Sequence, residues 1–273
     1  VDFPVSVFEL DSQLKFGPLG IIFRGRDTLI AGSGGSPDGE DAIHVFNFDD
    51  STELPLTPEN AQFNLKLEAD SENAAEGDFF SFDLTRRELY VTCGGDSEKG
   101  WIAVADLTDD EIVNLRRQFP ASELAKVAAP GGLAVSPEGH IVVSQMGSRD
   151  TPGDSVLAFY SPAGELLDKF PTGLNDIVAL AYGPRKKRLF ALDFSWADPA
   201  KGGLYQLIAV DSLDGCEAKL IAELKRPTAM AFDRNGDLYV TICGIPQGVR
   251  DELQGEDELL PDPGKLVLIK DVD

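Results

Sequence analysis

The chain is poor in histidine and cysteine, the residues behind much catalytic and zinc chemistry: its 273 residues include two histidines and three cysteines. His44 lies within a strand-like run and His140 follows a turn, so neither is placed to complete a Ser-His-Asp triad. Cys93 and Cys243 stand at matching places in two separate runs, which we expect to be too far apart for a disulfide, and we interpret Cys216 as a lone thiol. These scarcities argue against a serine-hydrolase triad and a cysteine/histidine zinc site.

Basic residues and long apolar runs are also scarce. With 24 Lys and Arg against 47 Asp and Glu, the net charge is −23, which argues against binding to nucleic acid or to an anionic membrane surface. No apolar run approaches the ~18 residues of a membrane span, so we expect no membrane insertion. Repulsion between like-charged copies favours a monomer. The start at Val1 rather than at methionine fits a removed leader or a trimmed chain, and slightly favours a secreted or periplasmic location.

Turns and short strand-like runs are abundant. Residues 130–147 (PGGLAVSPEGHIVVSQMG) and 227–244 (PTAMAFDRNGDLYVTICG) each hold an apolar run, a polar turn containing Gly139 or Gly236, and a β-branched run. This pattern predicts a β-hairpin. Weaker copies follow the same pattern at residues 20–34, 78–95 and 176–195. The hairpin therefore recurs about every 50 residues, which indicates a repeat fold.

The repeats predict an all-β propeller over residues 1–273, with five four-stranded blades. Each hairpin is followed by a third alternating run, and four of the five by a fourth, which is the pattern of propeller blades. Six blades is the alternative, although it needs another copy that we do not find. The fifth repeat lacks a fourth run, so we expect an N-terminal strand at residues 3–10 to close the last blade. Within the second repeat, residues 108–119 predict a short helix and residues 124–128 the fourth strand.

The two clearest copies resemble the NHL type of propeller repeat. That repeat has a Pro-x-Gly segment leading into an apolar run, a turn with glycine, and a strand ending near Tyr-Val-(Ala/Thr)-Asp. Residues 130–144 and 227–241 match it closely, and the other copies keep only the hydrophobic pattern. The resemblance implies a propeller architecture and leaves the activity open, because propellers include both binding modules and enzymes.

One face of the predicted propeller is acidic. The loops between second and third strands and those between blades should surround the mouth of the central channel, where function usually concentrates. The longest of these loops covers residues 244–264. Our candidate ligand-binding residues are acids of this loop together with one aromatic residue near the fourth repeat: Asp251, Glu252, Glu256, Asp257, Glu258 and Trp196. Such a face favours cations or a basic partner. Ordinary solvated charge, and packing of the aromatic ring over the rim, are the alternatives.

A candidate metal site lies around the fourth repeat. Asn175 and Asp176 precede its innermost strand, Asp193 ends its second strand, and Asp78 precedes the matching strand of the second repeat. Oxygen ligands converging from several blades would suit Ca²⁺ or another divalent ion. The alternative is that Asp176 and Asp193 bind backbone N–H groups at the strand ends.

The same residues resemble part of the senescence marker protein and gluconolactonase family. That resemblance implies metal-ligand roles for Asn175 and Asp193. The sequence departs from the family where Phe16-Gly17-Pro18 stands in place of Glu-Gly-Pro, and where Asp176 stands in place of glycine.

Two functions follow as hypotheses. The first is a binding module that holds a protein or a small molecule, with a basic partner expected, through the acidic mouth. The second is a divalent-metal-dependent hydrolase of the lactonase or esterase type, with Asp78, Asn175, Asp176 and Asp193 around the ion. No complete catalytic set is present, so the catalytic residues are unknown and the first hypothesis leads. A purely structural domain is a third possibility.

Overall fold

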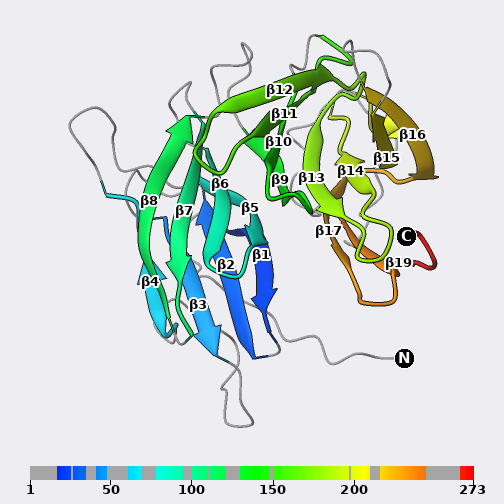
Figure 1. Ribbon diagram of the computed structural model, residues 1–273. Helices are drawn as coiled ribbons and strands as arrows, with labels where there is room; N and C mark the ends of the chain where they lie inside the picture. Colours follow the sequence, from blue (N-terminus) through cyan, green and yellow to red (C-terminus); the bar gives the residue numbers. More distant parts are fainter. Residues whose placement is uncertain are drawn as a thin grey trace, which may run out of the picture.

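The computed structural model describes residues 17–25, 27–34, 41–47, 61–68, 78–94, 100–109, 111–120, 130–147, 151–196, 198–209, 216–243 and 265–273. In these ranges the chain forms five antiparallel sheets arranged in a ring, which is a five-bladed β-propeller (Figure 1). The sequence prediction of an all-β propeller with five blades is confirmed. The described part of the chain contains no α-helix, and therefore none with the length and apolar character needed to cross a membrane.

Each blade is a meander in which strands that follow one another in sequence pair side by side. The first comprises β1 (Gly17–Arg24), β2 (Thr28–Gly34), β3 (Ile43–Asn47) and β4 (Phe63–Leu65). The second comprises β5 (Asp78–Leu84), β6 (Glu88–Gly94), β7 (Trp101–Leu107) and β8 (Ile112–Pro120). The third comprises β9 (Pro130–Val135), β10 (Ile141–Gln145), β11 (Val156–Tyr160) and β12 (Leu166–Pro171).

The fourth blade comprises β13 (Ile177–Tyr182), β14 (Leu189–Asp193), β15 (Gly203–Ala209) and β16 (Cys216–Glu223). A short 3-10 helix, η2 (Pro199–Lys201), lies between β14 and β15. The fifth blade has three described strands, β17 (Pro227–Phe232), β18 (Leu238–Ile242) and β19 (Lys265–Ile269). The N-terminal run at residues 3–10, which we predicted to complete this blade, lies outside the described residues.

The hairpin turns form because the sequence supplies hydrogen-bond acceptors and glycine where they are needed. Between β17 and β18, the carboxylate of Asp233 accepts hydrogen bonds from the backbone N–H groups of Asn235 and Asp237, at 2.7 and 3.0 Å. Gly236 has a positive φ of 78°, the left-handed conformation that glycine adopts without steric cost. The acidic side chain thus stabilises the turn through the backbone.

The hydrophobic core lies between the faces of neighbouring blades. One cluster joins Tyr90 and Ile102 of the second blade to Leu133 and Val143 of the third. A similar cluster joins the third blade to the fourth, and another joins the fourth to the fifth. The second strands β6, β10 and β14 are almost entirely buried, whereas the outer strands β12 and β16 are largely exposed. This layering leaves the loops at the strand ends to form sites.

The helix predicted for residues 108–119 is wrong. Most of this segment is the outer strand β8, which pairs with β7. The register shifts between Val104 and Asp106, and Asn114 has a φ of 57°, so the strand is irregular there. Strand pairing with β7 outweighed the local helical signal. The fourth strand of this blade is therefore β8, and the predicted strand at residues 124–128 lies outside the described residues.

Candidate functional site

Three of the four predicted metal ligands meet at one end of the fourth blade. Asp193 is the last residue of β14, and its register partner Ile177 opens β13. Asn175 and Asp176 directly precede β13 in the link from the third blade. The expectation that these residues share one strand end followed from the hairpin pattern, because antiparallel pairing places the start of one strand beside the end of the next.

The Asp193 carboxylate is bonded to backbone N–H groups on both of its oxygens. Oδ1 accepts hydrogen bonds from the N–H groups of Asp176 and Ser195, at 2.8 and 2.9 Å, and Oδ2 accepts one from the N–H of Asn175 at 3.0 Å. The residue is 1% exposed. Three bonds to a buried carboxylate are of the stronger, charge-assisted kind, so Asp193 holds together the start of β13 and the segment after β14.

Asp176 fixes the same segment from the other side. Its Oδ2 accepts a hydrogen bond of 2.6 Å from the N–H of Trp196, and its backbone carbonyl accepts one of 2.9 Å from the N–H of Phe194. Ser195, between them, has a positive φ of 50°, a conformation that costs a non-glycine residue energy and persists where its surroundings hold it. Asp176 and Asp193 together supply those surroundings.

Asn175 links the fourth blade to the third. Its Oδ1 accepts a hydrogen bond of 2.8 Å from the N–H of Gly153, in the loop between β10 and β11, and its backbone carbonyl accepts one of 2.9 Å from the N–H of Gly147. Its Nδ2 donates to Ser195 Oγ at 2.8 Å. The side chain therefore bridges the loops of two blades and orients both.

The predicted aromatic residue Trp196 lies on the segment that these bonds hold. Its side chain is 51% exposed, and its ring stacks on Phe194 with centroids 5.5 Å apart and an interplanar angle of 21°. An exposed, pre-positioned indole can stack on a flat or apolar ligand group, since its orientation is already set before binding.

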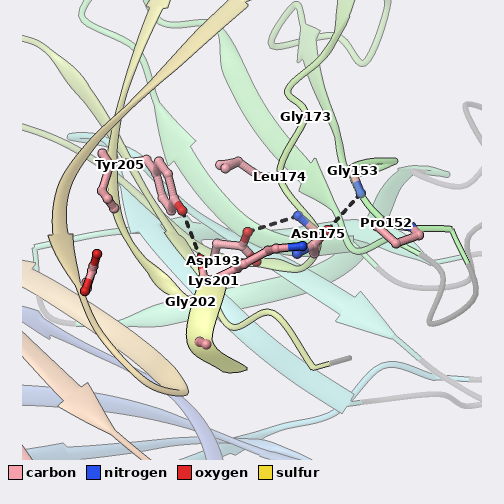
Figure 2. Close-up of a pocket in the computed structure, with 12 residues that line it drawn as sticks. Pro152, Gly153, Gly173, Leu174, Asn175, Asp193, Lys201, Gly202 and Tyr205 are labelled. Atoms are coloured by element: carbon pink, nitrogen blue, oxygen red, sulfur yellow. Dashed lines mark hydrogen bonds between the residues drawn. The ribbon is translucent and has the colours of Figure 1, made fainter. Parts of the chain in front are cut away.

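A pocket of about 410 Å³ opens beside this network. Its walls are residues 152–153 and 173–175 from the third-blade side, Asp193 and residues 200–202 at the end of the fourth blade, and Tyr205, Leu220 and Glu223 from β15 and β16. We call it the fourth-blade pocket. Figure 2 shows Asp193 and Lys201 at its centre, with Asn175, Gly153 and Pro152 on one side and Tyr205 on the other.

Burial and nearby carboxylates both act on the tyrosine of the fourth-blade pocket. Burial raises the pKa of the Tyr205 phenol, and the negative charges of Asp193 and Glu223 raise this pKa further. The Tyr205 hydroxyl donates a hydrogen bond of 2.9 Å to the backbone carbonyl of Lys201. The Lys201 ammonium lies 3.3 Å from a carboxylate oxygen of Asp198, in an exposed ion pair.

The remaining predicted residues are not brought to this place by the described structure. Asp78 is the first residue of β5, opposite Gly94, and the third blade lies between its blade and that of Asp193. The acidic residues Asp251, Glu252, Glu256, Asp257 and Glu258 lie outside the described residues. Within the described ranges, no group of three or more His, Cys, Asp or Glu side chains is placed to hold a metal ion.

A metal ion beside Asp193 would have to share the carboxylate with the three N–H groups that already bind it. We therefore derive no catalytic step through a metal, and the metal-ligand roles of Asp78, Asn175, Asp176 and Asp193 stay predictions. Sequence reasoning missed Tyr205, Leu220 and Glu223. They belong to regular strands, and no motif marks them.

The chain matches no protein-family profile and no curated protein. Many solved structures nevertheless share its architecture. An α-L-arabinofuranosidase from Clostridium thermocellum superimposes with a TM-score of 0.55 at 10% identity, over 95% of this chain and 91% of that one. The fold is that of a β-propeller.

Two further structures agree with this. A PQQ-bound aldose sugar dehydrogenase from Streptomyces coelicolor gives a TM-score of 0.51 at 13% identity, covering 92% of this chain and 80% of that one. A candidate 6-phosphogluconolactonase from Bacteroides uniformis gives 0.51 at 14% identity, covering 82% and 64%. The chain thus spans less than two thirds of that last protein. At such identities the likeness shows the fold alone, and the NHL and gluconolactonase resemblances stay predictions.

Proposed function

We propose that this propeller is a non-catalytic binding module whose ligand occupies the fourth-blade pocket and contacts the rim that carries Trp196. The observation that carries the proposal is that the carboxylates of Asp176 and Asp193 bind backbone N–H groups of the rim. Four backbone N–H groups, those of residues 175, 176, 195 and 196, donate to their carboxylates. These acids fix the shape of the rim. To react with a substrate, their carboxylates would have to give up hydrogen bonds that hold the loop.

A rigid rim is what a binding site needs. Association is opposed by the ordering of loops and side chains, so a site that is already ordered binds more tightly for the same contacts. Here the bonds of Asn175, Asp176 and Asp193 order the loops of two blades around one pocket of about 410 Å³, a size that suits a small ligand or one side chain of a larger partner.

The test compares two equally exposed leucines. Leu220 lines the fourth-blade pocket and Leu166 lies on β12 of the neighbouring blade, and both are 45% exposed. A set of neutral, cationic and anionic fragments would be screened for binding by ligand-observed NMR. We expect Leu220→Ala to weaken the hits while Leu166→Ala leaves them unchanged. An absence of hits, or equal binding by both variants, would overturn the proposal.

The metal-dependent hydrolase is the second candidate, and the convergence of Asp176, Asp193 and Asn175 favours it. Thermal unfolding of the chelated protein with and without Ca²⁺, Mg²⁺ or Zn²⁺ tests it directly. An ion that binds only the folded state adds about 2.7 kcal/mol at a hundred times its Kd. A midpoint shift that Asp176→Ala removes would support a metal site and call for a lactone and ester assay. Unchanged midpoints would leave the hydrolase without support.

A further inference from the structure

The fourth-blade pocket combines apolar walls with an excess of negative charge. Leu174 is buried, Leu220 is half exposed, and Tyr205 belongs to β15, the strand between β14 and β16; all three line the pocket. Asp193, at the blade end, and Glu223, at the end of β16, both line the pocket, and Glu223 is exposed. Such a lining suits a ligand that has a short apolar stem and a polar head.

The charges around the pocket indicate whether the polar head of the ligand is positive or negative. The lining contains two acidic residues, Asp193 and Glu223, and one basic residue, Lys201, so its formal charge is negative. The positive group in the lining, Lys201, is paired with Asp198 at 3.3 Å and its side chain is 65% exposed, so its charge is largely compensated and solvated. The overall charge of −23 acts in the same direction.

We propose that the fourth-blade pocket binds a cationic ammonium or guanidinium group carried on a short aliphatic stem. This inference rests on the proposed binding function and names its ligand class. The stem packs against Leu174 and Leu220, and the cation lies near Glu223 and the face of the Tyr205 ring. An aromatic face attracts a cation through its quadrupole, and a nearby carboxylate adds a charge pair. Either a free amine or a lysine or arginine side chain of a protein partner has this chemistry.

The probes are butylammonium and butylguanidinium, with the neutral butanol and the anionic butyrate as matched controls. We expect the two cations to bind more tightly than the controls, and their affinity to fall as salt is added. A short peptide with blocked ends and one lysine side chain distinguishes a free amine from a side chain of a protein partner. Equal binding by the peptide indicates a protein side chain, whereas binding by the free amines alone indicates a small molecule.

Paired substitutions on one strand test the assigned charge. Glu223 lines the pocket, and Glu217 is an exposed residue of the same strand β16 that does not. Glu223→Gln should weaken binding of butylammonium by about two- to fivefold, the range of an exposed charge pair, while Glu217→Gln leaves it unchanged.

The outcomes separate the two proposals. If butanol or butyrate binds as well as the cations and Leu220→Ala weakens that binding, the ligand class is wrong and the binding module stands. If Glu223→Gln and Glu217→Gln have equal effects on butylammonium binding, Glu223 is not the carboxylate that attracts the cation. If none of the four probes and no fragment binds, both proposals fail.

Discussion

Replacing Asp193 by alanine should lower the free energy of unfolding by several kcal/mol. The carboxylate is 1% exposed and accepts three backbone hydrogen bonds of 2.8 to 3.0 Å. Alanine leaves those three N–H groups without their acceptor, and each buried unsatisfied donor costs about 1–3 kcal/mol. Because losses within one network are not additive, we expect about 3–5 kcal/mol in total. Asp193→Asn keeps one acceptor oxygen and should cost about 1–3 kcal/mol.

Urea unfolding of the chelated protein, followed by circular dichroism, measures this loss without any contribution from a metal. The matched control is Asp198→Ala in the same loop, since the Asp198 carboxylate is exposed and forms an ion pair of 3.3 Å with Lys201. An exposed pair of this kind contributes below about 1 kcal/mol. If Asp193→Ala proves no more destabilising than Asp198→Ala, the carboxylate does not hold the loop and our account of the site is refuted.

Two further predictions concern contacts between blades. Gly132→Ala should cost more stability than Gly139→Ala in urea unfolding, because a Cβ on Gly132 would lie 2.6 Å from the backbone of Ala179, whereas a Cβ on Gly139 would meet open space and cost only the backbone strain of a φ of 89°; equal losses would contradict this close packing. The pKa of Asp83 is raised by burial although the N–H of Val135 donates to it, so its ionisation opposes folding and its contribution to stability falls as pH rises above 3.8. Asp83→Asn should therefore gain stability relative to the natural chain between acid and neutral pH, and a difference that does not vary with pH would refute this.

The five blades could be predicted because two signals agreed in the two clearest repeats and the hydrophobic pattern recurred in the other three. Alternating apolar residues defined the strands, and turns such as that containing Gly236 defined their connections. The helix expected around Ile112, Leu115 and Phe119 failed because their spacing has two physical explanations. An irregular strand with Asn114 in the left-handed conformation also buries residues at unequal intervals. The sequence alone does not distinguish these explanations, whereas pairing with β7 does.

The candidate site was predictable only where strand ends define it. Asn175, Asp176 and Asp193 could be placed together because hairpin pairing brings those positions side by side. Their hydrogen bonds to the N–H groups of residues 195 and 196 depend on the conformation of the loop after β14, which no local pattern specifies. Glu223 lines the pocket because β16 ends beside the loop after β14, a consequence of tertiary packing.

The most direct test of the proposed binding site is to map where a probe binds by following backbone amide signals in NMR during a titration with butylammonium. We predict that the largest shifts occur at the amides of Leu174, Tyr205 and Leu220, which line the fourth-blade pocket. Shifts that centre on another blade, or an unchanged spectrum for this probe and for the fragments, would contradict the assignment of this pocket as the ligand site.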